Sequence, residues 1–395
     1  MSDHDDPRAV TAAQRAVDDP AARVLENRYT DFDEPGGGGG GGPAIPSPYP
    51  TRVDPGLRTA PNDHRLREAL RMVTAQKAYE HLRLAVADIT DDPNRPLYVG
   101  YRDTEQTFIA STAKLAILLP AFALREAART AAAAITAKNE ADFFKQLAQA
   151  WRKPFERHFR GGKANNTRPD LQRILSAKRA KDTDPFTVDF TMQEAVDWAQ
   201  RGFHQRMLLA LKYSDNEAAA SCIRDLGFPY IHGVHKSAGL FTRNGLWVSL
   251  DFGGRHWDPA FGGSGQAATA RSLAELLTLV AQDRLVASGL AAEIRLLMGT
   301  YPGASAGSDL GRGILDRLPE AEEAALSLQG KIGYADGLFA DAIILRRTSA
   351  KGRKLAYVAV ALGGKSHDEI KQAGVALDDC VLLAHGEAVK PPANP

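Results

Sequence analysis

The sequence predicts an α/β protein in which a central antiparallel sheet is flanked by helices and joined to a helical subdomain. Two apolar runs of strand length, 342–345 and 355–362, follow each other near the end of the chain. A second strand pair, 84–89 and 97–99, lies near its beginning. Between the two pairs, residues 121–212 mostly have the apolar spacing of helices. Paired strands at both ends of a helical region indicate one sheet that carries a helical layer.

The first 61 residues are predicted to be a disordered tail rich in Gly and Pro. Seven consecutive glycines, Gly36 to Gly42, precede a run that contains four prolines. Such a segment cannot bury enough apolar surface to offset the entropy lost on ordering. A nucleotide-binding glycine loop is the alternative, but no strand precedes these glycines and no lysine or helix follows them in register. We therefore expect the folded domain to begin near residue 62.

The folded domain is predicted to span residues 62–386. Its first helix has an apolar stripe and a plausible N-cap at Asn62 or Asp63. Its last helix begins with the capping pattern of Ser366 and Glu369. The helical part occupies about 110–285, and residues 387–395 are expected to form a second tail.

A basic insertion interrupts the helical part at about 151–181. It holds ten Lys and Arg residues against only Glu156 and Asp170. A charge run of this kind is most often a solvated surface. The alternative is a docking site for an anionic substrate or partner, and both interpretations stay open.

Composition excludes several classes of protein. The chain of 395 residues is 44% hydrophobic and 25% charged, and its net charge of +1 gives no argument for binding nucleic acid or an anionic membrane. Two cysteines, Cys222 and Cys380, do not make a disulfide framework. No apolar run reaches transmembrane length, and the acidic N-terminus lacks the apolar core of a secretory signal. We expect a cytoplasmic protein without nucleic-acid or membrane partners, of undetermined oligomeric state.

No metal or cofactor is predicted. His232 and His235 are three residues apart, but no carboxylate or cysteine lies at a ligand spacing from them. We interpret both as ordinary loop histidines.

The strongest chemical signal is Ser111 with Lys114, at the start of the predicted buried helix in residues 108–120. Positions i and i+3 are neighbours on a helix. A serine hydroxyl is a poor nucleophile until a base removes its proton, and a desolvated lysine has a lowered pKa that suits this role. Unpaired N–H groups at a helix start can also stabilise an anion. The pattern is weak alone, because most such tetrapeptides lie on solvated helices.

Two further motifs follow in order. Ser214-Asp215-Asn216 lies at a predicted helix–helix junction, where these residue types also serve as N-caps without any catalytic role. Lys331-Ile332-Gly333 precedes the C-terminal strands.

Taken together, the three motifs resemble the serine β-lactamase and penicillin-binding protein superfamily, which carries S-x-x-K, S-D-N and K-T-G in that order. The S-D-N form is most similar to the class A β-lactamase branch. The resemblance covers about residues 62–386 and implies a β-lactamase/transpeptidase-like fold and an acyl-enzyme mechanism. The implied catalytic residues are Ser111, Lys114, Ser214 and Lys331, and the implied substrate-binding residues are Asn216, Gly333 and Tyr334.

Within this resemblance, Ser111 is the nucleophile and Lys114 takes part in removing its proton. Ser214 passes a proton to the leaving group, and Lys331 holds the Ser214 hydroxyl. Asn216 binds the amide side of the substrate. The backbone N–H groups of Ser111 and Tyr334 are expected to form the oxyanion hole.

The chain also departs from the family pattern. Ile332 replaces the usual hydroxyl residue, and no arginine occurs at 339–342, although Arg346 and Arg347 lie further along. No E-x-x-L-N motif supplies a deacylation base, and Asp251 is a weak candidate for that role. The predicted function is a serine hydrolase or acyltransferase that acts on a small-molecule or peptide ester or amide and turns over β-lactams poorly. The alternative is a non-catalytic binding protein that keeps the fold.

Overall fold

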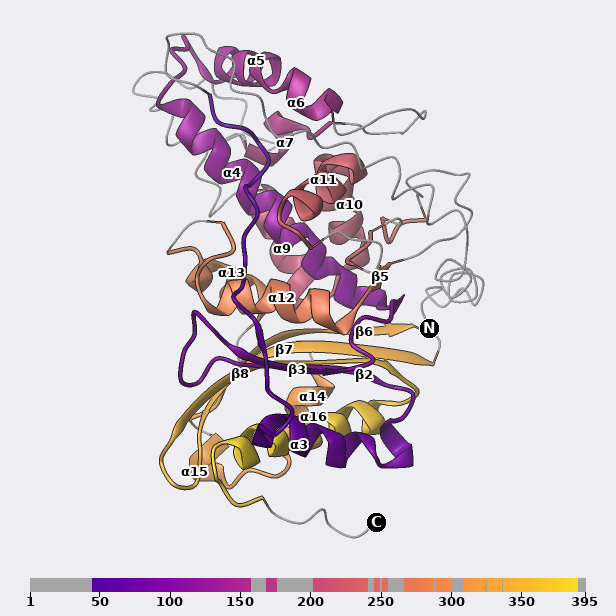
Figure 1. The fold of residues 1–395 in the computed structure, drawn as a ribbon. Helices are drawn as coiled ribbons and strands as arrows, with labels where there is room; N and C mark the ends of the chain where they lie inside the picture. Colours follow the sequence, from indigo (N-terminus) through magenta and orange to yellow (C-terminus); the bar gives the residue numbers. More distant parts are fainter. Residues whose placement is uncertain are drawn as a thin grey trace.

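A computed structural model describes residues 45–157, 168–175, 202–240, 245–248, 251–254, 266–286, 289–299, 308–323, 325–335 and 337–389. A six-stranded sheet lies in the middle of the molecule, with helices on both of its faces (Figure 1). The fold class predicted from the sequence is confirmed in this arrangement.

The order of strands in the sheet is β1-β3-β2-β8-β7-β6. The strands are β1 (Arg58–Thr59), β2 (Arg83–Asp88), β3 (Leu97–Tyr101), β6 (Ser327–Ala335), β7 (Leu338–Thr348) and β8 (Lys354–Gly364). Every neighbouring pair is antiparallel except β1 with β3. The strand β6 lies at one edge of the sheet. A separate two-stranded pair joins β4 (Thr107–Phe108) to β5 (Ala267–Ala268).

One face of the sheet packs on helices from the two ends of the domain. They are α3 (Arg65–Thr74), α14 (Asp309–Leu315) and α16 (His367–Ala384), with the short helix α15 (Glu320–Glu323) beside them. Alternate residues of the strands, including Val86, Ile343 and Ala359, point into this apolar core.

The caps of these helices were only partly predicted. The predicted cap of α16 is confirmed, since the backbone N–H of Glu369 donates to Ser366 Oγ at 3.1 Å. The N-cap of α3 is His64, whose Nδ1 accepts from Leu66 N at 3.2 Å. The predicted cap at Asn62 or Asp63 is therefore wrong by one or two residues.

The other face of the sheet carries the helical layer. Its elements are η2 (Ala110–Ile117), α4 (Leu118–Ala132), α9 (Gly202–Lys212), α10 (Asn216–Leu226), α11 (Phe228–Ser237), α12 (Ala270–Ala281) and α13 (Ala291–Met298). The short 3₁₀ turn η1 (Lys77–Tyr79) lies on the α3 side of the sheet, where Tyr79 joins the apolar core. Further from the sheet lie α5 (Glu140–Ala150), α6 (Arg152–Arg157) and α7 (Leu171–Leu175) (Figure 1). The helix α12 begins at the N-cap Thr269 and packs directly on the sheet. None of the helices in the described part of the chain has the length and apolarity needed to cross a bilayer.

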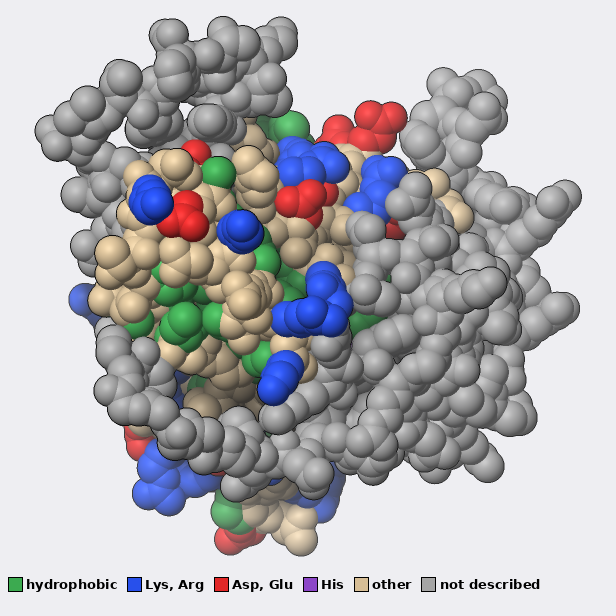
Figure 2. All heavy atoms as spheres, turned by 90° about the horizontal axis from the view of Figure 1, so that it is seen from above, with side chains coloured by type: hydrophobic (Ala, Val, Ile, Leu, Met, Phe, Trp, Pro, Cys, Tyr) green, Lys and Arg blue, Asp and Glu red, His purple; other side chains and the backbone are tan. Residues whose placement is uncertain are grey.

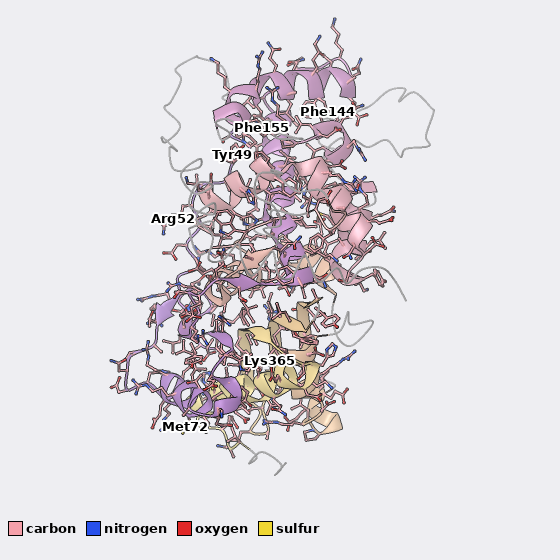
Figure 3. The ribbon with its side chains drawn as sticks, turned by 90° about the vertical axis from the view of Figure 1, so that its right-hand side faces the viewer. Tyr49, Arg52, Met72, Phe144, Phe155 and Lys365 are labelled. Carbon is pink, nitrogen blue, oxygen red and sulfur yellow. The ribbon has the colours of Figure 1, made fainter. Side chains whose placement is uncertain are left out.

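Residues 45–61 form a strap that belongs to the folded domain. In Figure 1 this segment runs from the outer helices down to α3. Tyr49 is buried, with its ring centroid 6.3 Å from that of Phe155 and 5.3 Å from that of Tyr230. Figure 3 labels Tyr49 and Phe155, which lie close together. Trp151 Nε1 donates to Pro46 O at 2.7 Å.

The predicted tail boundary at residue 61 is therefore wrong, because aromatic anchors and β1 offset the entropy cost that Gly and Pro suggested. Residues 1–44 lie outside the described residues. The second predicted tail begins too early as well. Glu387 is buried and accepts from Ser349 Oγ at 2.9 Å, while residues 390–395 lie outside the described part.

The basic insertion is described only at 151–157 and 168–175. Within it, Ile174 is buried and Arg173 Nε lies 3.3 Å from the Asp225 carboxylate on α10. Figure 2, a view onto the outer helices, shows Lys and Arg side chains mixed with Asp and Glu on the described part of this surface. These described parts fit a charged, solvated surface, and the rest of the insertion lies outside the described residues.

Candidate active site

Ser111 lies in η2, which has 3₁₀ geometry in place of the predicted α-helical turn. Side chains at i and i+3 of a 3₁₀-helix eclipse each other, so Ser111 and Lys114 share one side of η2. The α-helix proper starts at Leu118, with Pro120 in its first turn, where the missing N–H costs nothing. Among the described residues the Ser111 hydroxyl has no hydrogen-bond partner.

Lys114 is fully buried and points to the junction between α9 and α10. Its Nζ donates to Ser214 O at 2.7 Å, to Ser214 Oγ at 3.3 Å and to Asn216 Oδ1 at 2.6 Å. The structure thus brings the first two motifs together through this amine.

The Ser214 junction combines capping with placement of polar side chains. Asp215 is the N-cap of α10, and its carboxylate accepts from Ala218 N at 2.7 Å. Ser214 has a φ of 58°, a left-handed conformation that costs a non-Gly residue on the order of 1 kcal/mol or more. The capping interpretation therefore holds for Asp215, while its two neighbours, Ser214 and Asn216, direct their side chains to Lys114.

Lys331 reaches the same hydroxyl from the sheet edge. Its Nζ donates to Ser214 Oγ at 2.8 Å and to Ile332 O at 2.8 Å. Only 1% of Lys331 is exposed. Two buried amines from different elements therefore meet at the hydroxyl of Ser214.

Both amines have lowered pKa values. Burial, followed by the positive charge of Lys331, lowers the pKa of Lys114 to about 7, and Asp215 counteracts this in part. Burial lowers the pKa of Lys331 to about 8, with Asp341 acting in the opposite direction. A base with a pKa near the working pH is efficient in proton transfer. Lys114 has this property at neutral pH.

Gly333 lets β6 approach η2 closely. A Cβ at this position would collide with the Ile109 carbonyl and would lie 2.8 Å from Thr112 N. Thr112 Oγ1 lies 3.3 Å from both Lys331 O and Ala340 O, which ties η2 to the two strands. The third motif therefore needs glycine here for a steric reason.

Ile332 and Tyr334 alternate with Lys331 and Gly333 along β6, so their side chains point to the opposite side of the strand. The Tyr334 side chain is 49% exposed, and its ring centroid lies 4.7 Å from that of Phe339. The backbone N–H of Tyr334 stays a predicted oxyanion donor.

Neither Arg346 nor Arg347, both on β7, takes the place of an arginine that would bind a substrate carboxylate. Arg346 Nη2 donates to Ala281 O at 3.2 Å. Arg347 is bound to Asp378 at 2.6 Å and to Glu322 at 2.8 Å. Both guanidinium groups are committed to structural contacts.

Asp251 is buried, and its hydrogen bond and ion pair within the described residues are with Gly253 and Arg224. Its Oδ1 accepts from Gly253 N at 2.9 Å, and its Oδ2 lies 3.5 Å from Arg224 Nε on α10. The next residue, Phe252, lies against Lys114, with Nζ 4.8 Å from the ring centroid. Sequence reasoning missed Phe252, because no motif or periodicity marks it.

Sequence reasoning also misjudged His232 and His235. His232 and His235 are buried in α11, so their assignment to a loop is wrong. His235 Nε2 donates to Ala116 O at 2.7 Å and so supports η2 from behind. Burial lowers the pKa of His235 to about 4 and that of His232 to about 3, which keeps both rings neutral. In the part of the chain that the structure describes, no group of His, Cys, Asp and Glu is arranged to hold a metal ion.

Comparisons with known proteins give matches only among solved structures. No family model and no curated protein matches the chain. The chain is similar to a β-lactamase from Sphaerobacter thermophilus DSM 20745 (14% identity, 82% of this chain and 98% of that one, TM-score 0.46). It is also similar to a class A β-lactamase representative from Bacteroides cellulosilyticus DSM 14838 (12%, 82% and 100%, TM-score 0.47). A third structure is that of PBP-A (16%, 83% and 98%, TM-score 0.43).

Proposed function

We propose that this protein is a serine hydrolase or acyltransferase that forms an acyl-enzyme at Ser111. The observation that carries the proposal is the meeting of Lys114 and Lys331 at the Ser214 hydroxyl, with Ser111 one 3₁₀ turn from Lys114. Burying two amines whose hydrogen bonds go only to neutral oxygens is costly. A role in proton transfer explains why the protein has two buried amines despite this cost, whereas a non-catalytic binding protein with the same fold would gain nothing from them.

In the proposed mechanism, neutral Lys114 removes the proton of Ser111 as its Oγ attacks the substrate carbonyl. The hydrogen bond between these two groups forms only when substrate is bound, as is common for catalytic contacts. The Ser214 hydroxyl, which lies between the two amines, passes a proton to the leaving group. Charged Lys331 keeps the Ser214 hydroxyl oriented and stabilises negative charge in the transition state.

The substrate class is an ester, amide or peptide with an acyl group that needs no carboxylate anchor. Arg346 and Arg347 are bound elsewhere, and position 332 is an isoleucine. β-Lactams are therefore expected to bind weakly and to turn over slowly. Asp251 supports the second expectation, since its carboxylate is held by Gly253 and Arg224.

A serine-directed probe tests the proposal. A fluorophosphonate should label the purified protein at neutral pH, and mass spectrometry should place the adduct on the peptide that contains Ser111. Ser111→Ala should abolish this label without lowering the melting temperature, while Ser237→Ala, on a helix away from the lysines, serves as the matched control. Labelling that persists in Ser111→Ala, or none in the parent protein, would refute the proposal in favour of a non-catalytic role.

A further inference from the structure

The side chain of Phe252 covers one side of the Lys114 amine. The ring centroid lies 4.8 Å from Nζ, while the other contacts of this amine are the Ser214 and Asn216 oxygens. A phenyl ring, unlike a carboxylate, has no oxygen that can accept a hydrogen bond from a water molecule. Among the described residues, the group on this side of the base is therefore an apolar ring and not a carboxylate that could bind and activate a water.

The backbone holds Phe252 in this place against its conformational preference. Its φ is 62°, which costs a bulky non-Gly residue on the order of 1–3 kcal/mol. Such a conformation persists only where neighbouring contacts impose it.

Those contacts come from the residues on either side. Asp251 accepts from Gly253 N at 2.9 Å and lies 3.5 Å from Arg224 Nε. A Cβ on Gly253 would touch Ala220 at 3.4 Å, so this short segment lies directly on α10. Asn216, Ala220 and Arg224 are four residues apart and share one face of α10. The same helix face thus holds Lys114 at one end and fixes the segment that carries Phe252 at the other.

We propose that Phe252 shields the acyl-Ser111 ester from water, so that the acyl group passes to an amine or alcohol acceptor in preference to water. This inference rests on the proposed function and adds to it the class of acceptor. Phe252 is a positioning residue, because it acts through Lys114 and through the exclusion of water.

The two competing steps differ only in the nucleophile. In hydrolysis, the water oxygen bonds to the acyl carbon, the bond from that carbon to Ser111 Oγ breaks, one proton of the water passes to Ser111 Oγ, and the product is a carboxylic acid. In transfer, the nitrogen or oxygen of the acceptor forms the new bond, and the proton that it loses returns to Ser111 Oγ through Lys114. An amine or alcohol acceptor that binds at the site displaces water. The Phe252 ring therefore hinders attack by the acceptor less than it hinders attack by water.

The partition between these steps can be measured with the full-length chain. A nitrophenyl ester acylates Ser111, and hydroxylamine then competes with water, so that hydroxamate and acid report transfer and hydrolysis. The parent protein should give more hydroxamate than acid, with an acyl-enzyme that mass spectrometry detects. Phe252→Asn should lower the hydroxamate-to-acid ratio by about tenfold, which corresponds to about 1.4 kcal/mol in the difference between the two barriers.

Phe252→Leu is the matched control. Leucine and asparagine are similar in size, but leucine is apolar and tolerates a positive φ poorly, whereas asparagine is polar and tolerates it well. Phe252→Leu should keep the ratio within about threefold of the parent value, because it still excludes water. Phe252→Asn should melt at or above the temperature of Phe252→Leu, since it relieves the backbone strain.

The outcomes separate the two proposals. If neither the parent nor the variants form an acyl-enzyme, the proposed function is wrong and the role of Phe252 falls with it. If the acyl-enzyme forms but the ratio is the same in the parent, Phe252→Asn and Phe252→Leu, the shield is refuted while the function stands. A lower melting temperature and an unchanged ratio in Phe252→Asn would give Phe252 a structural role only.

Discussion

Two buried clusters that lie on opposite faces of the central sheet differ in how their charges are compensated. On the α16 face, Arg347 lies 2.6 Å from the Asp378 carboxylate, and Tyr357 donates to the same carboxylate at 2.6 Å. On the helical face, Lys114 and Lys331 have only neutral oxygen acceptors in their hydrogen bonds. Opposite charges satisfy each other in the first group, whereas the two amines of the second group repel each other.

This difference sets a structural cluster apart from the cluster that we propose to be catalytic. A paired guanidinium and carboxylate lock two elements together, since removing either partner leaves a buried charge alone. Two buried amines gain nothing of this kind, and the positive charge of Lys331 lowers the affinity of Lys114 for a proton. Amines that have perturbed pKa values and no carboxylate in their hydrogen bonds are typical of functional sites.

The largest effect is expected for Lys114→Met. Loss of a general base typically lowers the rate by a factor of about 10² to 10⁴, so labelling of Ser111 should slow by that amount. At low pH, however, Lys114→Met should increase the stability of the folded protein. The pKa of Lys114 is lowered in the folded state, so the unfolded chain binds more protons between about pH 7 and 10.5, and the folded state loses stability as the pH falls through that range.

Chemical denaturation should therefore find Lys114→Met more stable than the parent below pH 7, by about 1–2 kcal/mol once the lost hydrogen bonds are subtracted. The gain should shrink as the pH rises toward 10.5. A variant that is destabilised at pH 6 would show that Lys114 holds the fold together, and the contrast between the two faces would fail.

The reverse result is expected on the other face. Asp378→Ala should lower the free energy of unfolding by about 3–5 kcal/mol, because Arg347 stays buried without its main partner. The double variant Arg347→Met with Asp378→Leu should recover most of that loss, since apolar residues of similar volume replace buried ion pairs well. Labelling of Ser111 per folded molecule should stay at the parent rate in both variants.

Equal destabilisation by the single and the double variant would mean that packing at this position matters more than charge. In that case the cluster could not be contrasted with the lysines on electrostatic grounds. Urea denaturation of the three proteins side by side provides the measurement.

The smallest effect is expected in the pH profile of acylation. The rate should rise as Lys114 loses its proton near pH 7 and should fall as Lys331 loses its charge near pH 8, which gives a narrow optimum between the two values. The two apparent values belong to the coupled pair of amines. The acylation rate measured from pH 5 to 10 checks this, and Lys331→Arg, whose charge does not titrate, should remove the alkaline fall. A profile that stays flat across this range would contradict the assignment of both amines.

The sequence was enough to locate the sheet, the helical layer and the three motifs, because these depend on local patterns. Strand alternation and helix caps are properties of neighbouring residues, which is why the cap at Ser366 and the turn before α10 were predictable. The start of the domain was not predictable in the same way. Tyr49 is ordered by Phe155 and Tyr230, which lie more than a hundred residues away in the chain.

Only the tertiary structure decided how the site is built. The sequence places Lys114 beside Ser111, but its hydrogen bonds go to Ser214 and Asn216, since the tight turn between α9 and α10 presents their oxygens. Phe252 contacts Lys114 because Asp251 and Arg224 fix its backbone on α10. A contact between residues 138 positions apart has no local signature, and it depends on burial and on shape, which exist only after the chain has folded.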